Sequence, residues 1–254
     1  MLKYFKVILI FINLLSFAEA QTFGFGCLGF VGGYAGFSYQ EFKSTGLNEY
    51  INYTNQLENT IEPVNEFSSA TGYRVGLNLF RATFESGIIL TAKGFYQYLS
   101  KKNIGTVGIN VNDENYSMDL TFKNWSFGFD VGWEFTKVIS WKVLDGSLNF
   151  NNVILIQTTD LPGETIVNKY KSDSGVFGYS IGTGIIVSVI KDYVSIEGLA
   201  GYTYVVIDNV YDENGTPLLN PVQIPEQAVW TENKFIESGG FSAVIQLNVG
   251  FPLL

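Results

Sequence analysis

Bulky apolar residues alternate with small or polar residues over long stretches of the chain. In the segment 124–135, tryptophan, phenylalanine and valine occupy the odd positions, whereas serine, glycine and acidic residues occupy most of the even ones. The segments 177–189 and 241–251 show the same alternation. Because successive side chains of a strand point to opposite faces, a period of two predicts β-strands with one apolar and one polar face.

Eight such segments can be counted, and the connections between them are alternately short and long. The short connections lie around 81–82, 137–138 and 191–192, and the others are long and polar. An up-and-down barrel with short periplasmic turns and longer outer loops has this alternation. The chain is therefore predicted to be all-β, an eight-stranded antiparallel up-and-down transmembrane β-barrel, although the pattern alone does not distinguish eight strands from ten. The expected strands are 26–42, 68–81, 83–100, 114–135, 140–157, 171–190, 193–208 and 233–252.

Aromatic residues mark the ends of the apolar faces. Ten residues of a strand tilted by about 45° rise by roughly 23 Å, close to the ~25 Å apolar band of outer-membrane barrels with its aromatic girdles. These positions are predicted to face lipid. The expected girdle is Trp125, Trp133, Phe135, Phe241 and Phe251.

Charged residues on the opposite face are predicted to point into the lumen, because a charge facing lipid near the bilayer centre costs about 2–4 kcal/mol. Arg74 and Lys93 would be the cations of an acidic lumen, with Asp130 as the favoured partner. An interior filled by this network is the preferred interpretation, and an ion path is the alternative. The expected lumen charge network is Arg74, Glu85, Lys93, Asp130, Glu134 and Glu197.

The first long connection has a different period. Ser44 or Thr45 can cap the start of a helix that Pro63 would close. The residues that recur at helical spacing are Leu47, Tyr50, Ile51, Thr54, Leu57 and Ile61. This pattern predicts a short amphipathic helix in the first outer loop, over the barrel mouth or on the outer leaflet. The last long connection, 208–232, contains three prolines and an acidic bias, and is expected to be an irregular exposed loop.

The N-terminus has the features of a signal peptide. Lys3 and Lys6 precede an apolar stretch too short to span a bilayer, and Ala18-Glu19-Ala20 has the small-x-small pattern of a cleavage site. The expected division is a signal peptide at 1–20 and a barrel domain at 21–254.

Composition narrows the possible functions. The mean hydropathy is +0.16 and only 15% of the residues are charged, against about 25% in ordinary soluble domains. The net charge of −9 argues against nucleic acid as a partner. The chain has no histidine and a single cysteine, Cys27, so catalytic systems and zinc sites that need histidine are excluded. No enzymatic activity, cofactor or metal is therefore expected.

The pattern resembles the small outer-membrane barrels of the OmpA-like, OmpX-like and PorT-like families. The resemblance rests on the architecture, the glycine-rich opening 29–36 and the closing stretch 240–251, which is similar to the signal read by the barrel-insertion machinery. That signal commonly ends on the last residue, whereas three residues follow Phe251 here.

The resemblance implies a place in the bacterial outer membrane, with outer-membrane lipid and the insertion machinery as partners. A structural or surface-interaction role through the outer loops is the leading hypothesis, with an unidentified envelope or surface protein as a further partner. The alternatives are a narrow, porin-like channel for small solutes and a component of a protein-secretion machinery. A soluble lipocalin-like binder would need the opposite orientation of Trp125 and Asp130.

Overall fold

Most of the chain after the expected signal peptide is described by the computed structural model. The expected signal peptide at 1–20 and the start of the first expected strand lie outside the described residues, as do Glu85 and Phe251. The described residues are 32–57, 60–84, 86–109, 112–161, 163–190, 193–218 and 234–250.

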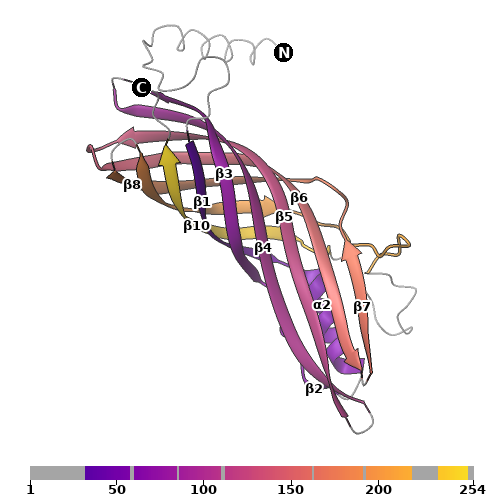
Figure 1. The fold of residues 1–254 in the computed structure, drawn as a ribbon. Helices are drawn as coiled ribbons and strands as arrows, with labels where there is room; N and C mark the ends of the chain where they lie inside the picture. The colour runs from indigo at the N-terminus through magenta and orange to yellow at the C-terminus, as the bar shows by residue number, and fades with distance from the viewer. Residues whose placement is uncertain are drawn as a thin grey trace, which may run out of the picture.

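Antiparallel strands form a closed barrel (Figure 1). The first and last of them pair with each other, from Gly32 opposite Gly250 to Lys43 opposite Ser238, and β4 pairs with β5 to complete the ring. Within the described residues the ring has eight strands, which confirms the predicted fold. They are β1 (Gly32–Lys43), β3 (Ser69–Thr83), β4 (Ile88–Ile109), β5 (Asn112–Glu134), β6 (Ile139–Leu161), β8 (Val176–Ile190), β9 (Val194–Val205) and β10 (Ser238–Gly250).

Short turns gather at one end of the barrel, where β1 begins and β10 ends (Figure 1). The β3–β4 turn contains Gly87, whose φ of 80° is readily adopted only by glycine, and its backbone N–H donates to Phe84. We call this the short-turn end and the opposite one the outer end.

Two of the expected loops at the outer end are strands instead. Residues 101–109 continue β4, and they pair with the beginning of β5 up to Ile109 opposite Asn112. Residues 158–161 continue β6, which turns back into β7 (Glu164–Lys171). The outward face of these segments is polar because it meets water, and backbone pairing makes them strands all the same. With the short β2 (Thr60–Glu62), they extend one side of the barrel wall.

The predicted helix is α2 (Thr45–Leu57), and it lies against the inner face of this extension (Figure 1). Leu47 and Ile51 are fully buried, while the carbonyl of Ser44 accepts the first backbone hydrogen bond from Asn48. The helix and its neighbours enclose an apolar core in the outer half of the barrel. This outer core is Phe42, Leu47, Ile51, Val64, Phe67, Ala70, Leu99, Met118, Leu120, Phe122, Val153, Leu155, Val205, Ile207, Val210, Leu218, Phe235 and Ile236.

The last long connection contributes to this core. Val210 and Leu218 are buried next to Ile207 of the preceding segment, whereas Asp208 and residues 213–215 are exposed, so the described beginning of the 208–232 segment is only partly exposed. The segment is mostly polar, and the spacing of its two buried apolar side chains matches neither a helix nor a strand.

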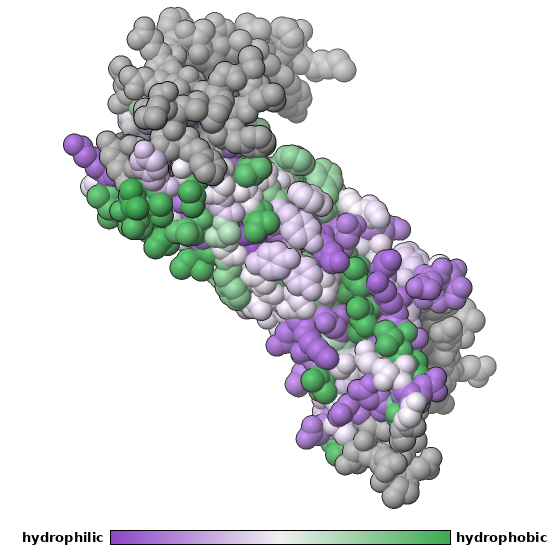
Figure 2. Space-filling model, viewed as in Figure 1, coloured by the Kyte–Doolittle hydropathy of each residue, from purple (hydrophilic) through white to green (hydrophobic). Residues whose placement is uncertain are grey.

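A belt of exposed apolar side chains surrounds the half of the barrel nearest the short-turn end. Phe127 and Phe129 are 58% and 72% exposed, and outward apolar residues of other strands, such as Leu148, Ile181 and Ile245, are exposed as well. In Figure 2, green and pale surfaces occupy this part of the visible face, and purple, hydrophilic residues become common toward the outer end. No helix among the described residues is long and apolar enough to cross a membrane.

Candidate functional site

The lumen near the short-turn end contains a cluster of buried charges. Lys142 forms ion pairs with Asp130 at 3.0 Å and with Asp145 at 3.4 Å, and a third one with Glu197. Lys93 pairs with Asp145 and lies 3.6 Å from Asp130. We call these five residues the lumen cluster; they come from four strands and are each at least nine-tenths buried.

A β-bulge in β6 brings two of these residues into the lumen. Val131 of β5 pairs with Leu144, but the next residue, Gly132, pairs with Lys142, so that Val143 is an extra residue. Val143 and Leu144 are both exposed, whereas Lys142 and Asp145 are buried on either side of them. A bulge of this kind breaks the alternation, which is why sequence reasoning missed both charges. The only sequence signal is the pair of charges three residues apart within an apolar strand.

Arg74 lies in the same part of the lumen but outside the lumen cluster. Its guanidinium donates two hydrogen bonds to the Gln97 side-chain oxygen, at 2.9 and 2.7 Å, and stacks over the Phe95 ring at 4.1 Å. No ion pair within the described residues includes it. The expected contact with Asp130 is therefore replaced by an amide and an aromatic ring.

The buried charges balance. Among the described residues, the buried cations are Arg74, Lys93 and Lys142, and the buried anions are Asp130, Asp145 and Glu197. Among the described residues, the expectation of an acidic lumen with two cations is thus corrected, because it lacked Lys142 and Asp145 and included Glu134, whose side chain is exposed. A neutral network removes the electrostatic reason for attracting either cations or anions into the interior.

Of the six expected lumen residues, one cannot be placed and one lies outside the network. Glu85 lies outside the described residues. Glu134 is the last residue of β5; its side chain is exposed at the short-turn end, where strand parity no longer determines contact with the lumen. No ion pair of the described part of the chain includes Glu134. The other four, Arg74, Lys93, Asp130 and Glu197, are buried inside the barrel.

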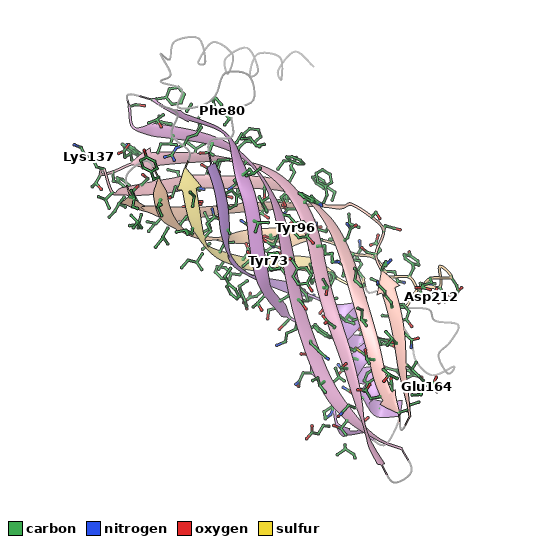
Figure 3. All side chains as sticks on the ribbon, viewed as in Figure 1. Tyr73, Phe80, Tyr96, Lys137, Glu164 and Asp212 are labelled. Atoms are coloured by element: carbon green, nitrogen blue, oxygen red, sulfur yellow. The ribbon has the colours of Figure 1, made fainter. Side chains whose placement is uncertain are left out.

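The expected girdle residues lie on the outer surface, with Phe251 outside the described residues. Trp125 and Phe241 belong to the ring of aromatic side chains nearer the outer end, and Trp133 and Phe135 to the ring at the short-turn end. Stacked or tilted pairs join neighbouring strands within the rings, as in Tyr96 with Trp125 at 5.1 Å. Figure 3 labels Tyr73 and Tyr96 midway along the molecule, Phe80 and Lys137 toward the short-turn end and Glu164 at the outer end.

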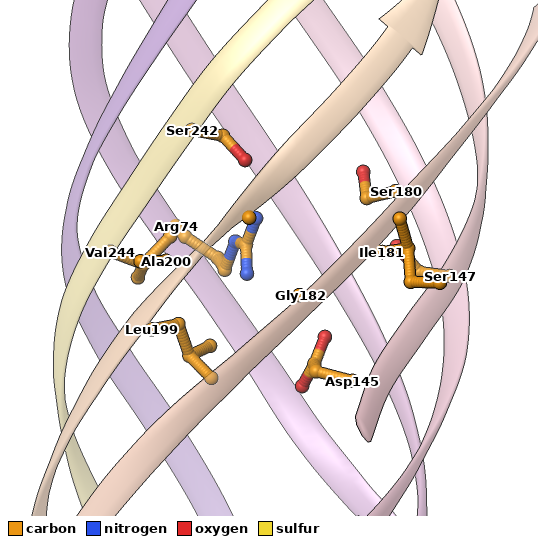
Figure 4. A pocket seen from close by; sticks show the side chains of 11 residues that line it. Arg74, Asp145, Ser147, Ser180, Ile181, Gly182, Leu199, Ala200, Ser242 and Val244 are labelled. Carbon is orange, nitrogen blue, oxygen red and sulfur yellow. The ribbon is translucent and has the colours of Figure 1, made fainter. Parts of the chain in front are cut away.

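A small cavity of about 30 Å³ lies beside the lumen cluster (Figure 4). Arg74 and Asp145 point toward each other across it, and Ser147, Ser180 and Ser242 line its wall. This volume is enough for one or two ordered water molecules and for no larger solute.

Polar side chains above the cavity bond to one another across strands. Asn149 accepts from Ser126 at 2.8 Å and donates to Ser180 at 2.7 Å, and Ser180 lies 3.0 Å from Thr203. Such a connected layer satisfies its own donors and acceptors and offers few groups to a ligand. No group of three potential metal-binding side chains occurs among the described residues.

Hydrogen bonds and packing also secure the outer end. Lys43 and Thr45 donate to the Glu237 carboxylate, at 2.8 and 2.6 Å, and together hold its pKa below the usual range. The start of α2 is thus tied to the start of β10. Tyr116, in the extended part of β5, packs against the outer core.

The chain matches no protein-family model and no curated protein. Among solved structures, it is similar in fold to Ail, the attachment invasion locus protein of Yersinia pestis, with a TM-score of 0.37 and 11% identity over 87% of this chain and 97% of that chain. The complex of Ail with the heparin analogue sucrose octasulfate gives the same TM-score at 10% identity. The outer membrane protease OmpT from Escherichia coli gives a TM-score of 0.42 and 11% identity over 88% of this chain and 94% of that chain.

These likenesses concern the barrel architecture. A barrel fold does not by itself decide whether a protein is an enzyme, because chemistry depends on sites rather than on folds.

Proposed function

We propose that this protein is a bacterial outer-membrane β-barrel with a closed lumen, which presents its packed outer end for interactions at the cell surface. The observation that carries the proposal is the inverted distribution of polarity. Phe127 and Phe129 of β5 are more than half exposed, while the charges of the lumen cluster are buried. A water-soluble protein would gain free energy from the opposite arrangement, whereas a lipid environment favours this one.

Two different groups of side chains fill the lumen. The lumen cluster and its polar neighbours fill the half near the short-turn end, and the outer core with α2 fills the other half. An eight-stranded barrel has an interior just wide enough for side chains, so neither half leaves a path for solutes. This argues against the alternative of a small-solute channel.

The proposed role is not catalytic. The carboxylates of the lumen are engaged by lysines, and the chain has no histidine that could act as a base near neutral pH. The outer end is instead a rigid platform, since its helix and extended hairpins share one apolar core.

The membrane part of the proposal is tested by purifying the mature protein with and without detergent. We expect it to require detergent, and to migrate faster on a gel before boiling than after, because the folded barrel resists the denaturing sample buffer. A protein that stays monomeric and folded without detergent would overturn the proposal.

The closed lumen is tested separately in planar bilayers. The reconstituted protein should produce no steps of conductance above the background. Regular single-channel steps, in a preparation shown by gel migration to be folded, would favour the channel instead.

A further inference from the structure

Lysines gather on the outer wall directly beyond the apolar belt. On β5, Lys123 lies two positions from Trp125, and therefore on the same outward face. Its partners across the sheet are Tyr98 of β4 and Asn152 of β6. Lys123 thus marks the point at which the wall changes from aromatic to polar.

Three more lysines share this face. Two of them lie in one row of paired residues that crosses four strands. Lys169 of β7 is opposite Ile156 of β6. Ile156 is opposite Asp119 of β5, and Asp119 is opposite Lys102 of β4. Lys171 is one outward position nearer the belt, opposite Ile154. Four strands at about 4.8 Å spacing place these side chains within a surface roughly 15 Å wide. The lysine patch is defined as Lys102, Lys123, Lys169 and Lys171.

The four lysines of this patch form no ion pair within the described part of the chain. Three of its lysines are exposed and the fourth, Lys123, is half-buried. Asp119, the carboxylate within the patch, accepts hydrogen bonds from Ser100 and Thr121. A protein with a net charge of −9 therefore carries a positive surface at this level.

We propose that the lysine patch binds the phosphate groups of anionic lipid headgroups in the outer leaflet, an inference that rests on the proposed membrane function. In a bilayer, headgroups lie just beyond the aromatic girdle, at the height at which Lys123 follows Trp125. Long lysine side chains can extend their ammonium groups to this level while their stems cover the wall. Basic residues near a membrane surface attract anionic lipids, with about a fivefold gain in binding for each lysine.

A lipid is favoured over a protein partner because the patch is on the side of the wall, continuous with the belt. A partner approaching from the aqueous side would meet the outer end, where Glu164 and Asp212 lie, before it met the patch (Figure 3).

The test uses the full-length mature protein in a neutral detergent. Phosphatidylglycerol or phosphatidylcholine is added, and the bound lipids are counted by native mass spectrometry. The wild type should retain phosphatidylglycerol in preference to phosphatidylcholine, and the preference should weaken at high salt. The variant K102Q/K123Q/K169Q/K171Q should lose at least tenfold in affinity for phosphatidylglycerol and bind phosphatidylcholine as before.

Two control variants test whether the lipid preference depends on positive charge and whether that charge must lie in the lysine patch. Replacing the same four lysines by arginine should keep the preference, and Lys137→Gln, at the short-turn end, should leave it unchanged. Equal retention of phosphatidylglycerol by the wild type and the glutamine variant would overturn the inference. In that case the need for detergent and the heat-dependent migration would still support the proposed function. A wild-type protein that shows neither property would overturn the proposed function as well.

Discussion

The charged residues of the lumen are expected to contribute unequally to the stability of the fold. Lys142 contacts three carboxylates, whereas Arg74 contacts an amide and an aromatic ring. Removing one partner of a buried ion pair leaves the other charge uncompensated, which costs more than losing a hydrogen bond to a neutral group.

Lys142→Met should therefore lower the free energy of unfolding by about 3–5 kcal/mol, and Arg74→Met by about 1–3 kcal/mol. Urea unfolding in detergent micelles, followed by tryptophan fluorescence, measures both. Adding Glu197→Gln to Lys142→Met should restore part of the loss, because it removes one of the stranded negative charges. Equal losses for the two single variants would mean that the ion pairs do not determine stability.

The alternation of apolar and polar residues predicts which side chains point into the lumen on regular strands, but it fails on a strand that contains a bulge. Asp130 and Glu197 lie on strands where the alternation near them is unbroken, and both are buried. Lys142 and Asp145 flank the bulge at Val143, where two successive side chains point outward. A bulge depends on pairing with neighbouring strands, and a single strand's sequence does not contain that information.

At the scale of elements, α2 is held by apolar packing on one side and by polar contacts at its start. Ile51 is fully buried in the outer core, while Gln56, on the same helix, is exposed. Most residues of the helix are polar, so its docking depends on a few apolar side chains.

Ile51→Ala should reduce the stability of the docked helix by about 2–5 kcal/mol, the usual cost of truncating a buried isoleucine. Limited proteolysis of the reconstituted protein should then cut within 45–57, while the heat-dependent migration of the barrel persists. Gln56→Ala is the matched control and should be cut no faster than the wild type. Loss of the folded barrel band in Ile51→Ala would show that the helix and the barrel unfold together.

The contact between Glu237 and the start of α2 gives a pH dependence. Because its pKa is lower in the folded state than in the unfolded one, the carboxylate adds stability at pH values above its unfolded pKa. This contribution is lost as the pH falls through the lowered, folded pKa. Hydrogen exchange of the α2 amides should thus accelerate in acid, and Glu237→Gln should exchange faster at neutral pH with less change on acidification. An identical acid response in both proteins would exclude this carboxylate as the cause.

Elements were predictable where the pattern is periodic. The helix at 45–57 follows from its apolar stripe, and the eight strands from their alternation. The extensions of β4 and β6, together with β7, lie in segments that were expected to be loops because they are polar, and polarity alone does not distinguish a projecting hairpin from a loop.

At the scale of the whole molecule, one barrel encloses two different interiors. Toward the short-turn end the interior is polar and electrically balanced, and toward the outer end it is an ordinary apolar core. The first is surrounded by the exposed belt and the second by the extended wall of β4 to β7. In the proposed bilayer, the polar interior therefore has apolar surroundings, and the apolar interior has polar surroundings.

Barrel closure depends on the pairing of β1 with β10, the first and last strands of the described chain. Hairpins such as β4–β5 can form as soon as their residues are available, but this seam requires the two ends of the chain to meet, and such distant contacts form slowly. Until then, both strands have unpaired edges that can bind to other chains. The time between export and closure is consequently the period in which this chain is most exposed to aggregation, and any factor that assists its assembly would need to shield these two edges.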